Sequence, residues 1–488
     1  MPISPKLGPE AAAANMDELA PQYTPQEALI EANRCLFCFD APCIQACPTG
    51  IDIPSFIKKI TTGNLTGSAR AILSANILGA SCARVCPTEV LCEGACVVLD
   101  REGDPVKIGR LQRYATDHAM AKRLQILKAP ARKSGKRIAV IGGGPAGLGC
   151  AAELAQLGHQ VVVFDKHPAA GGLNTYGIAC YKMMPDLSLA EVDLVKSLGV
   201  DFRCGVEVGK DITLDQLDKE FDAIFLGVGL GKGARLNAPG EELPEVIEAL
   251  DFIEQLHTQP LHEVAVGDRV AIIGGGNTAI DAVTQAKRLG AREAVLVYRR
   301  SQEQMPAYAF EQALARTDGA RFLFNVVPTE ILSNGTGHVI GLRLARTASA
   351  DGKLQVLPGS EFVEPFDMVI KAIGEEKQVG FFKKLLPKLE LDRRGAVAHH
   401  PDTGQTNIPH IFTGGDCANG GREVVNAVAE GKKAARGIHA FFAGQKITGP
   451  IQASRYGVKG TPLGSGFDRP IRVPELEKEY AQKHAKPS

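Results

Sequence analysis

The sequence predicts a multidomain protein in which an N-terminal α-helical segment precedes two α/β units of the dinucleotide-binding type. Two observations predict the α/β units, because a strand, a glycine-rich turn, a helix and a second strand follow one another from Arg137 and again from Arg269. A third observation distinguishes the N-terminal part from the α/β units: eight of the 12 cysteines lie between Cys35 and Cys96. The length of 488 residues allows roughly three or four units at about 150 residues each.

Composition narrows the class of protein. Lys plus Arg and Asp plus Glu number 55 each, so the net charge favours neither nucleic acid nor an anionic membrane surface as a partner. The N-terminus has no basic region followed by an apolar one, and no later run approaches the roughly 18 apolar residues of a membrane span. We therefore expect a cytoplasmic protein. In such a chain, clustered cysteines favour metal ligation over disulfides.

The N-terminal part contains two compact cysteine groups. Residues 1–24 are rich in Pro and Ala and are expected to form an arm, a helical pattern begins at Pro25, and one helical segment is expected over about Ile53 to Ala75. A Cys-Pro pair in each group is typical of the thiolate runs that hold 4Fe-4S clusters, in which one run can serve the other cluster. The first group is Cys35, Cys38, Cys43 and Cys47, and the second is Cys82, Cys86, Cys92 and Cys96.

Zinc is the alternative, since it also takes four thiolates, but structural zinc usually shows two well-separated CxxC pairs. The spacing alone does not assign ligands to clusters. After the cysteines we expect a helix over Ile108 to Ala121 and then a basic linker that is a solvated connection between domains.

The first α/β unit begins at Arg137 with a nucleotide-binding fingerprint. Gly142 permits the tight turn, Gly144 lets the backbone approach a pyrophosphate, and Gly147 lets helix and strand pack closely. The helix N-terminus, with Pro145 and Ala146, offers free N–H groups to the phosphates. Asp165 ends the second strand, where a ribose-binding carboxylate belongs.

Later segments are expected to complete the same site. Gly171 and Gly172, followed by Leu173, would let the backbone pass close to a bound ring system. The apolar run that ends at Gly229 has a shape suited to closing over the dinucleotide. Near the C-terminus, Gly415 and Asp416 follow a strand, and a carboxylate there can hydrogen-bond a ribityl hydroxyl while the helix over Val424 to Phe442 faces the flavin ring.

The second α/β unit begins at Arg269 and repeats this logic. Its predicted cofactor-binding residues are Gly274, Gly276, Asn277, Thr278, Ala279 and Asp281 in the turn and the helix, with Arg299 and Arg300 at the end of the second strand. Arginine at that position can pair with a 2′-phosphate and favours NADP, whereas a carboxylate would favour NAD. The arginines can equally be surface charges or contact the pyrophosphate. Two fingerprints in one chain imply FAD at the first and NADH or NADPH at the second.

These cofactors define the chemistry. With a nicotinamide and a flavin stacked between the units, the protein supplies position and electrostatics, so no catalytic acid or base is needed. A flavin accepts two electrons and can release them singly, as iron-sulfur clusters require. No CxxC lies beside the flavin region, so the dithiol relay of thioredoxin reductase lacks its residues. The isolated cysteines are interpreted as core residues: Cys150, Cys180, Cys204 and Cys417.

A family resemblance is carried by CLFCFDAPCIQACPTGIDIPSFI, SCARVCPTEVLCEGAC, IGRLQRYATD, VIGGGPAGL, GGGNTAID with VYRR, and FTGGD. These motifs resemble the NAD(P)H-oxidising, FAD-containing subunit of dihydropyrimidine dehydrogenase and, more broadly, the small subunit of glutamate synthase. The resemblance covers about residues 30–442. It implies that one 4Fe-4S cluster is bound by Cys35, Cys38, Cys43 and Cys96, and the other by Cys47, Cys86, Cys92 and the amide oxygen of Gln112, with Cys82 spare.

Two details of the pattern favour the pyrimidine enzyme. The glutamate synthase pattern is shorter between the second pair of cysteines and has an acid where Gln112 stands, whereas here five residues separate Cys86 from Cys92. The chain ends near residue 488 without a pyrimidine-reducing barrel or FMN site. The resemblance therefore implies the electron-input subunit of a hetero-oligomer, whose partner holds FMN and iron-sulfur clusters and reduces uracil or thymine. The alternative is the small subunit of glutamate synthase or another NAD(P)H:ferredoxin-type oxidoreductase.

The expected domain organisation follows from the motifs and the resemblance together. The nicotinamide domain is expected as an insertion in the flavin domain. The expected domains are a helical domain with two 4Fe-4S clusters (1–133), the first part of the FAD domain (134–262), the inserted NAD(P)H domain (263–374), the second part of the FAD domain (375–444) and a tail (445–488).

Overall fold

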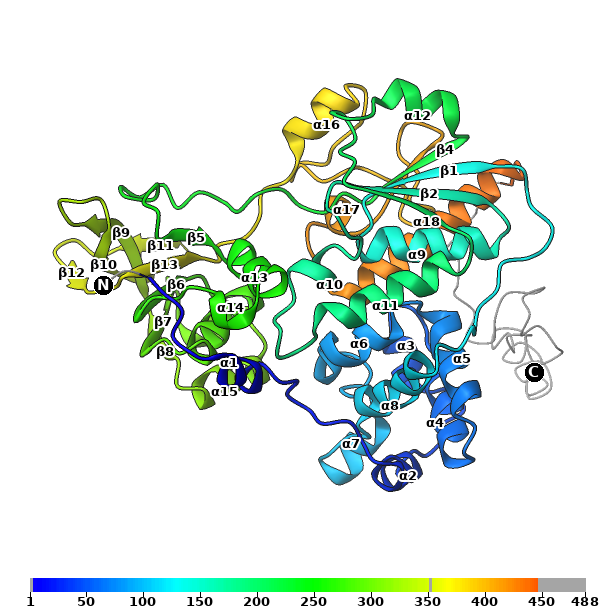
Figure 1. The fold of residues 1–488 in the computed structure, drawn as a ribbon, viewed down its shortest axis with the longest axis horizontal. Coiled ribbons are helices and arrows are strands. Elements are labelled where there is room, and N and C mark those ends of the chain that lie inside the picture. The colour runs from blue at the N-terminus through cyan, green and yellow to red at the C-terminus, as the bar shows by residue number, and fades with distance from the viewer. Residues whose placement is uncertain (1–2, 351–352, 446–488) are drawn as a thin grey trace, which may run out of the picture.

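The computed structural model describes residues 3–350 and 353–445. Figure 1 shows a helical unit packed beneath one α/β unit, with a second α/β unit beside them. We call these the helical unit (residues 25–121), the first unit (the sheet containing β1) and the second unit (the sheet containing β6). Within the described ranges, no helix is long and apolar enough to cross a membrane. The expected tail lies outside the described residues, apart from Gln445.

The helical unit consists of short helices around an apolar core. Helix α4 shows why they pack: Ile53, Phe56, Ile57 and Ile60 recur at helical spacing and are all buried. Thr24 and Glu27 form a capping box at the start of α2. The helices are α2 (Pro25–Asn33), α3 (Pro42–Ala46), α4 (Ile53–Thr61), α5 (Leu65–Ala75), α6 (Gly79–Val85), η1 (Thr88–Val90), α7 (Val97–Glu102) and α8 (Ile108–Ala121).

The single helix expected over Ile53 to Ala75 is wrong, because the structure breaks it into α4 and α5. Gly63 between them has a φ of 71°, a left-handed conformation that ends a helix. Asn64 then caps α5, since its side chain accepts a hydrogen bond from the N–H of Gly67. The Gly-Asn pair in the sequence carried this signal.

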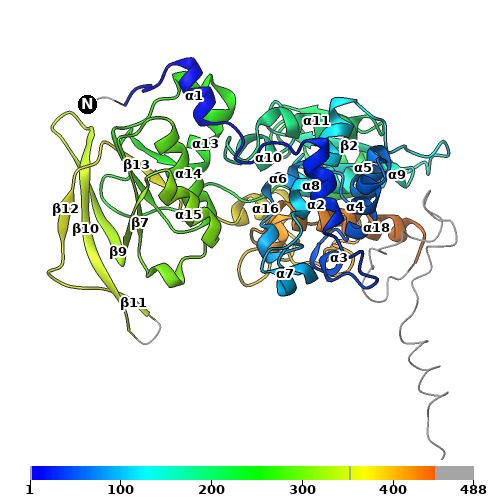
Figure 2. The same ribbon diagram turned by 90° about the horizontal axis from the view of Figure 1, so that it is seen from below.

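The N-terminal arm contains a helix and lies against the second unit. Helix α1 (Pro9–Asn15) buries Ala12, and Met16 joins the apolar core of the second unit. The Asn15 side chain donates a hydrogen bond to the carbonyl of Arg288 at 2.8 Å. Figure 2 shows the arm running from this helix across to α2. The first residues therefore bridge the second unit and the helical unit.

The first unit contains a five-stranded parallel sheet with the order β14-β4-β1-β2-β3. Its strands are β1 (Arg137–Ile141), β2 (Gln160–Asp165), β3 (Asp201–Cys204), β4 (Ala223–Leu226) and β14 (Ile411–Thr413). Its helices are α9 (Pro145–Gln156), α10 (Leu173–Tyr176), α11 (Pro185–Lys196), α12 (Leu214–Glu220), α16 (Val379–Leu385), α17 (Asp416–Asn419) and α18 (Val424–Phe442). The helices α8 and α18 have the bounds expected from sequence.

The second unit contains another parallel sheet, with the order β5-β13-β6-β7-β8. Because β5 already belongs to this sheet, the chain enters the second unit before the boundary at residue 262 expected from sequence. The strands are β5 (Val246–Glu248), β6 (Arg269–Ile273), β7 (Glu293–Tyr298), β8 (Arg321–Phe324) and β13 (Met368–Lys371). The helices are α13 (Ala249–Thr258), η2 (Leu261–Glu263), α14 (Asn277–Arg288), η3 (Gln302–Gln304) and α15 (Ala309–Thr317).

An antiparallel sheet extends the second unit at its outer edge, where Figure 2 shows β10 and β12 at the far side from the helical unit. Strand β10 (Val339–Ala350) pairs with β9 (Val326–Ser333), β11 (Lys353–Val356) and β12 (Phe362–Glu364). Its buried residues, such as Leu342 and Leu344, pack with Val295 of β7 in one core. The sequence motifs had not indicated this element.

Candidate functional site

In the first fingerprint turn, two glycine positions leave no room for a side chain, whereas a third, Gly144, has space for one. Gly142 has a φ of 100°, and a Cβ atom there would lie 2.3 Å from the carbonyl oxygen of Gly227. A Cβ on Gly147 would lie 1.9 Å from the carbonyl oxygen of Gly142. At Gly144 a Cβ would meet only Gly172, at 3.7 Å, so the fold itself does not require glycine. This open position at the N-terminus of α9 is what an approaching pyrophosphate needs.

Asp165 lies beside this turn, as the last residue of β2. Its Oδ2 accepts a hydrogen bond from the N–H of Gly143 at 2.7 Å, and its Oδ1 accepts one from the N–H of His167 at 2.8 Å. The carboxylate is therefore fixed at the carboxyl edge of the sheet, next to the first turn of α9, where Pro145 and Ala146 lie. This position fits a ribose-binding carboxylate.

The second glycine pair packs directly on the fingerprint turn. The N–H of Gly171 donates to the carbonyl of Gly143 at 2.8 Å, and a Cβ on Gly172 would lie 2.7 Å from the Cα of Gly144. Gly172 has a φ of 56° and begins α10, whose first residue, Leu173, is 46% exposed. Two backbone loops thus form a cradle with an apolar side chain at its rim.

Asn174 is a residue that the sequence reasoning missed. Its side chain is 1% exposed, and among the described residues neither its Oδ1 nor its Nδ2 has a hydrogen-bond partner. Buried amides are normally paired, so an unpaired amide beside the glycine cradle fits a bound group that supplies polar atoms. The sequence did carry a signal for Asn174, because it is a polar residue between the glycine pair and the apolar segment that follows.

Two further elements reach the same edge. Strand β14 lies next to β4, which brings Gly415 and Asp416 to the edge where Gly229 follows β4. The N–H of Gly415 donates to Glu430 Oε2 at 2.8 Å, and Asp416 Oδ1 accepts from the N–H of Arg422 at 3.2 Å. Burial raises the pKa of Asp416. All the residues predicted for the flavin therefore converge at one sheet edge, and their arrangement fits FAD.

The second fingerprint shows the same contrast between its glycines. A Cβ on Gly274 would lie 2.1 Å from the carbonyl oxygen of Ala372, whereas a Cβ on Gly276 would have nothing within 4 Å. Ala279 occupies the third small position and is fully buried. The open space at Gly276, at the N-terminus of α14, fits the pyrophosphate of a nicotinamide dinucleotide.

The polar residues of this turn divide into two groups. Asn277 and Thr278 begin α14 at the open position, and Asn277 Oδ1 accepts a hydrogen bond from the N–H of Tyr308 at 3.0 Å. Asp281 instead contacts the first unit, because its Oδ1 lies 2.8 Å from the Tyr181 hydroxyl and 2.7 Å from Lys182 Nζ. We therefore assign Asp281 to the junction between the units rather than to the nucleotide.

The two arginines lie at the expected end of β7. Arg299 and Arg300 are exposed, and within the described part of the chain neither guanidinium forms an ion pair. Tyr298 precedes them, and a Cβ on Gly275 would lie 2.4 Å from its ring, so the strand end is held against the fingerprint turn. Two unpaired cations beside a nucleotide turn fit a 2′-phosphate.

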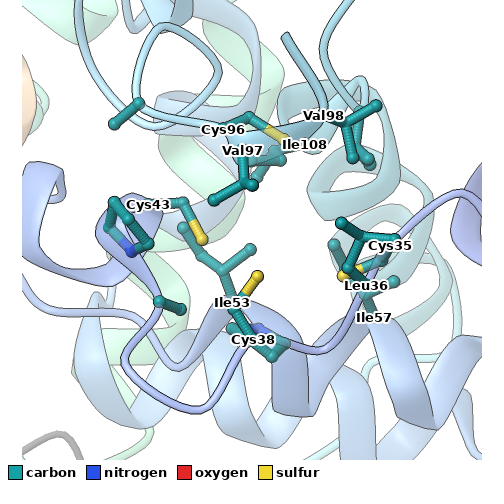
Figure 3. Close-up of a pocket in the computed structure, with 15 residues that line it drawn as sticks. Cys35, Leu36, Cys38, Cys43, Ile53, Ile57, Cys96, Val97, Val98 and Ile108 are labelled. Atoms are coloured by element: carbon teal, nitrogen blue, oxygen red, sulfur yellow. The ribbon is translucent and has the colours of Figure 1, made fainter. Parts of the chain in front are cut away.

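The first set of thiols lines one pocket in the helical unit. Figure 3 shows the sulfur atoms of Cys38 and Cys43 pointing into the space between the labelled side chains, with Cys35 and Cys96 across from them. Burial raises the pKa of the Cys43 thiol to about 12, and negative charge on Cys35, Cys96 and Cys38 adds to the increase. Bound iron would remove this penalty by stabilising the thiolates. Apolar side chains, including Ile53, complete the wall.

The second set of thiols lies toward the first unit. A hydrogen bond with Cys82 and burial raise the pKa of the Cys86 thiol, and Cys47 and Cys92 add to the increase. Burial, then Glu93, then Cys47 raise the pKa of Cys92. Each set thus mixes the two sequence groups, with Cys96 beside the first group and Cys47 beside the second.

Gln112 and Cys82 both lie at α6, the helix that leads to Cys86. The Gln112 side chain is buried, and its Nε2 donates a hydrogen bond to the carbonyl of Gly79 at 2.7 Å. This bond leaves the amide oxygen as the atom that can serve as a ligand. Cys82 Sγ accepts a hydrogen bond from Asn76 Nδ2 at 3.1 Å, in a buried position. Cys82 also shares a hydrogen bond with Cys86, so both the Gln112 amide oxygen and the Cys82 thiol are candidates for the fourth ligand.

Across residues 3–350 and 353–445, no group of three or more His, Cys, Asp or Glu side chains is arranged to hold a metal ion. A tetrahedral zinc site would require four donors within about 2.3 Å of one ion. The four thiolates of a 4Fe-4S cluster each bind a different iron, and therefore they line a wider space. The cavity between the thiols of the first set fits the cluster.

The fold and these sites define a class: a flavoprotein with two dinucleotide-binding units and an attached iron-sulfur domain. Residues 12–124 match the family described as dihydropyrimidine dehydrogenase domain II, 4Fe-4S cluster, and residues 136–431 match the pyridine nucleotide-disulphide oxidoreductase family. The chain therefore belongs to the pyridine nucleotide-disulphide oxidoreductase family and carries the 4Fe-4S domain at its N-terminus. It is an NAD(P)H-dependent oxidoreductase.

Curated relatives extend over nearly the whole chain. The chain is 38% identical over 445 residues to the glutamate synthase [NADPH] small chain of Halomonas elongata, covering 87% of this chain and 93% of that one. It is 34% identical over 429 residues to the NAD-dependent dihydropyrimidine dehydrogenase subunit PreT of Escherichia coli strain K12, covering 88% and 98%.

Solved structures support the fold of the two α/β units. FprA of Mycobacterium tuberculosis in complex with NADPH has a TM-score of 0.51 at 18% identity, covering 72% of this chain and 91% of that one. Thioredoxin reductase of T. acidophilum has a TM-score of 0.50 at 19% identity, covering 63% of this chain and 99% of that one. At these identities the likeness concerns the fold alone.

Proposed function

We propose that this chain is the electron-input subunit of a hetero-oligomer. In this role the chain oxidises NAD(P)H at FAD and passes the electrons through two 4Fe-4S clusters to a partner subunit. One observation carries the proposal: two separate sets of thiols lie in a unit that packs directly on the flavin-binding fold. A bound flavin would take two electrons from the nicotinamide and release them singly to the clusters. The residues of this chain hold the cofactors in place and exclude water between them.

The contacts between units set the order of the proposed path. Lys432 of α18, in the first unit, donates hydrogen bonds to the carbonyls of Ser74 and Ala75 at the end of α5. The negative charge of Cys47 acts on this same lysine, so the second set of thiols lies near α18. The first set is lined by Ile53 and Ile57 of α4, which Figure 1 shows on the side of the helical unit away from the first unit. We therefore place the cluster of Cys47, Cys86, Cys92 and Gln112 next to the flavin, and the other cluster toward the partner.

We propose a pyrimidine-reducing subunit as the partner, which would hold FMN and iron-sulfur clusters and reduce uracil or thymine to the 5,6-dihydro form. The buried Gln112 and the five residues between Cys86 and Cys92 support this choice, as does the likeness to PreT. A glutamate synthase large subunit is the second candidate, and the 38% identity to the glutamate synthase small chain supports it.

Reconstitution tests the partner directly. The chain is purified with both cofactors and mixed with a pyrimidine-reducing subunit or with a glutamate synthase large subunit, in the presence of NADH or NADPH. The proposal predicts nucleotide-dependent conversion of uracil only when both proteins are present. Glutamate formation from glutamine and 2-oxoglutarate, without uracil conversion, would establish the second candidate. The pyrimidine subunit alone, supplied with the nucleotide, is the control.

For the nucleotide we propose NADPH. Arg299 and Arg300 support it, because two exposed guanidinium groups, without an ion pair in the described part of the chain, follow β7 beside the fingerprint turn, where a 2′-phosphate would lie. The relatives divide on this point, since the name of the Halomonas protein specifies NADPH and that of PreT specifies NAD.

A further inference from the structure

A short segment of the first unit is embedded in the second. Residues 178–182 follow the glycine cradle and α10, yet Cys180 is fully buried in the apolar core of the second unit, together with Phe252 and Ile280. The N–H of Cys180 donates a hydrogen bond to Gln285 Oε1 at 3.1 Å. We call residues 178–182 the junction loop.

The junction loop is bound by one face of the nucleotide-binding helix α14. Asp281, Gln285 and Arg288 are four and three residues apart, so they lie on the same face of the helix. The Tyr181 hydroxyl donates to Asp281 Oδ1 at 2.8 Å, and the Arg288 guanidinium lies 4.6 Å from the centre of the Tyr181 ring. Tyr181 itself is fully buried. The helix that begins at Gly276 therefore holds the loop that follows the flavin cradle.

Lys182 forms the ionic centre of this junction. Its Nζ lies 2.7 Å from Asp281 Oδ1 on α14 and 2.7 Å from Glu311 Oε1 on α15. All three side chains are at most 14% exposed, and among the described residues Glu311 Oε2 has no hydrogen-bond partner. Because all three side chains are largely withdrawn from water, a shift of one unit against the other would leave buried charges without their partners, at a high cost in free energy.

A second polar contact joins the same units. The Tyr308 hydroxyl, from the loop before α15, donates to Glu423 Oε1 at 2.7 Å, and Glu423 immediately precedes α18. The Tyr308 N–H is bound by Asn277 of the nucleotide turn. Lys182 and Tyr308 thus connect the two cofactor sites at two points, and only the Lys182 contact is a buried ion pair.

We propose that Lys182 is a positioning residue for hydride transfer, because its ion pairs with Asp281 and Glu311 hold the nicotinamide-binding unit in register with the flavin-binding unit. The inference rests on the proposed oxidation of NAD(P)H at FAD. In that reaction a hydride leaves the reduced nicotinamide for the flavin, so the nicotinamide loses two electrons and the flavin gains them. Hydride transfer depends on reacting atoms about 3–3.5 Å apart, and a misplacement of about 1 Å can slow it 100-fold.

The test is anaerobic stopped-flow measurement of flavin reduction in the flavin-loaded protein. Lys182→Met should lower the limiting rate of reduction by NADH or NADPH at least tenfold, with the dissociation constant for the nucleotide changed less than threefold. Reduction by dithionite should keep the rate of the original protein. Lys182→Arg should restore most of the rate. Lys196→Met is the control, because that lysine is exposed on α11 and pairs only with Asp193 among the described residues.

A limiting rate in Lys182→Met within twofold of the unsubstituted protein would overturn the inference. Absence of flavin reduction by either nucleotide in the unsubstituted protein would instead overturn the proposed function. Hydrogen exchange gives a second measurement that needs no nucleotide. Backbone amides of α14 and α15 should exchange faster in Lys182→Met than in Lys182→Arg. Equal exchange in the two variants would contradict the docking role.

Glu311→Gln serves if Lys182→Met does not fold, because it keeps the pair between Lys182 and Asp281. Burial raises the pKa of Glu311 to about 7, and Asp281 and Glu423 add to the increase, whereas Lys182 opposes it. Tyr181 and Tyr308 also face this group. The reduction rate should fall as the pH decreases through 7, since Glu311 then becomes neutral, and Glu311→Gln should remove that dependence. An unchanged profile and rate in Glu311→Gln would overturn the inference.

Discussion

The carboxylate of Glu191, on α11 of the first unit, accepts a hydrogen bond from the backbone N–H of Ser81 at 3.1 Å. It also accepts the N–H of Ala80 at 2.8 Å and the hydroxyl of Ser81. Both N–H groups belong to the first turn of α6, the helix that carries Cys82 and leads to Cys86. Glu191 is fully buried, so one side chain fastens the iron-sulfur helix to the flavin-binding fold.

Replacing Glu191 should loosen this attachment. We expect Glu191→Ala to lower the free energy of unfolding by about 3 kcal/mol at pH 5, because the buried N–H groups of Ala80 and Ser81 lose their acceptor. Thermal unfolding followed by circular dichroism measures the change. Asp193→Ala is the matched control on the same helix, since Asp193 is exposed and, among the residues that the structure describes, forms an ion pair only with nearby Lys196. Equal losses in both variants would contradict the special role of Glu191.

Glu191 should also make stability depend on pH. Burial raises its pKa from 4.5 to about 7, so the folded protein holds this proton more tightly than the unfolded chain does. Its contribution is fully present below pH 4.5 and is lost as the pH rises through 7, by about 3 kcal/mol in total. Urea unfolding between pH 5 and 8 should show the loss, and Glu191→Gln should lack it. Parallel pH profiles for the two proteins would refute the prediction.

The thiol sets predict how iron content responds to substitution. Cys43→Ala removes a thiol from the cavity of the first set, so iron should fall from about eight to about four atoms per chain. Cys82→Ala is the control, because the proposed ligand sets leave that buried cysteine out. Metal analysis measures the iron content of both variants. A loss of iron in Cys82→Ala would show that Cys82, and not Gln112, completes the second cluster.

A substitution at Gly276 tests nucleotide binding without disturbing the fold. A Cβ there would have nothing within 4 Å, and its φ of −85° suits alanine. Gly276→Ala should therefore leave the unfolding temperature unchanged while raising KM for the nicotinamide nucleotide at least tenfold, because a methyl group would occupy the space of the pyrophosphate. Gly380→Ala, at another open position, is the control. Unchanged KM would place the nucleotide elsewhere.

The arginines predict the nucleotide preference. Replacing Arg299 and Arg300 together by alanine should raise KM for NADPH roughly 10- to 100-fold, since charge-assisted hydrogen bonds to a 2′-phosphate are worth about 1.5–3 kcal/mol each. KM for NADH should stay within about twofold, because NADH lacks that phosphate. Arg292→Ala is the control, because Arg292 is exposed at the opposite end of β7. Equal effects on both nucleotides would assign the arginines to the pyrophosphate.

The sequence by itself determined the features that are encoded locally. In each fingerprint, about thirty consecutive residues specify the strand, the turn and the helix. Close contacts that need glycine fall inside that same stretch, between Gly147 and the Gly142 carbonyl and between Gly275 and the Tyr298 ring. The bounds of α8 and α18 also follow from local periodicity. The break between α4 and α5 was equally local, and the Gly63-Asn64 pair marked it.

Only the tertiary structure decided which distant residues meet. Spacing does not reveal that Cys96 lies with Cys35, that β5 belongs to the second sheet, or that Asp281 forms an ion pair with Lys182. The family resemblance supplied the division of the cysteines, but the residues alone did not. These relationships depend on side chains and strands that are far apart in the sequence and meet only when the chain is folded. Local patterns carry no record of such contacts.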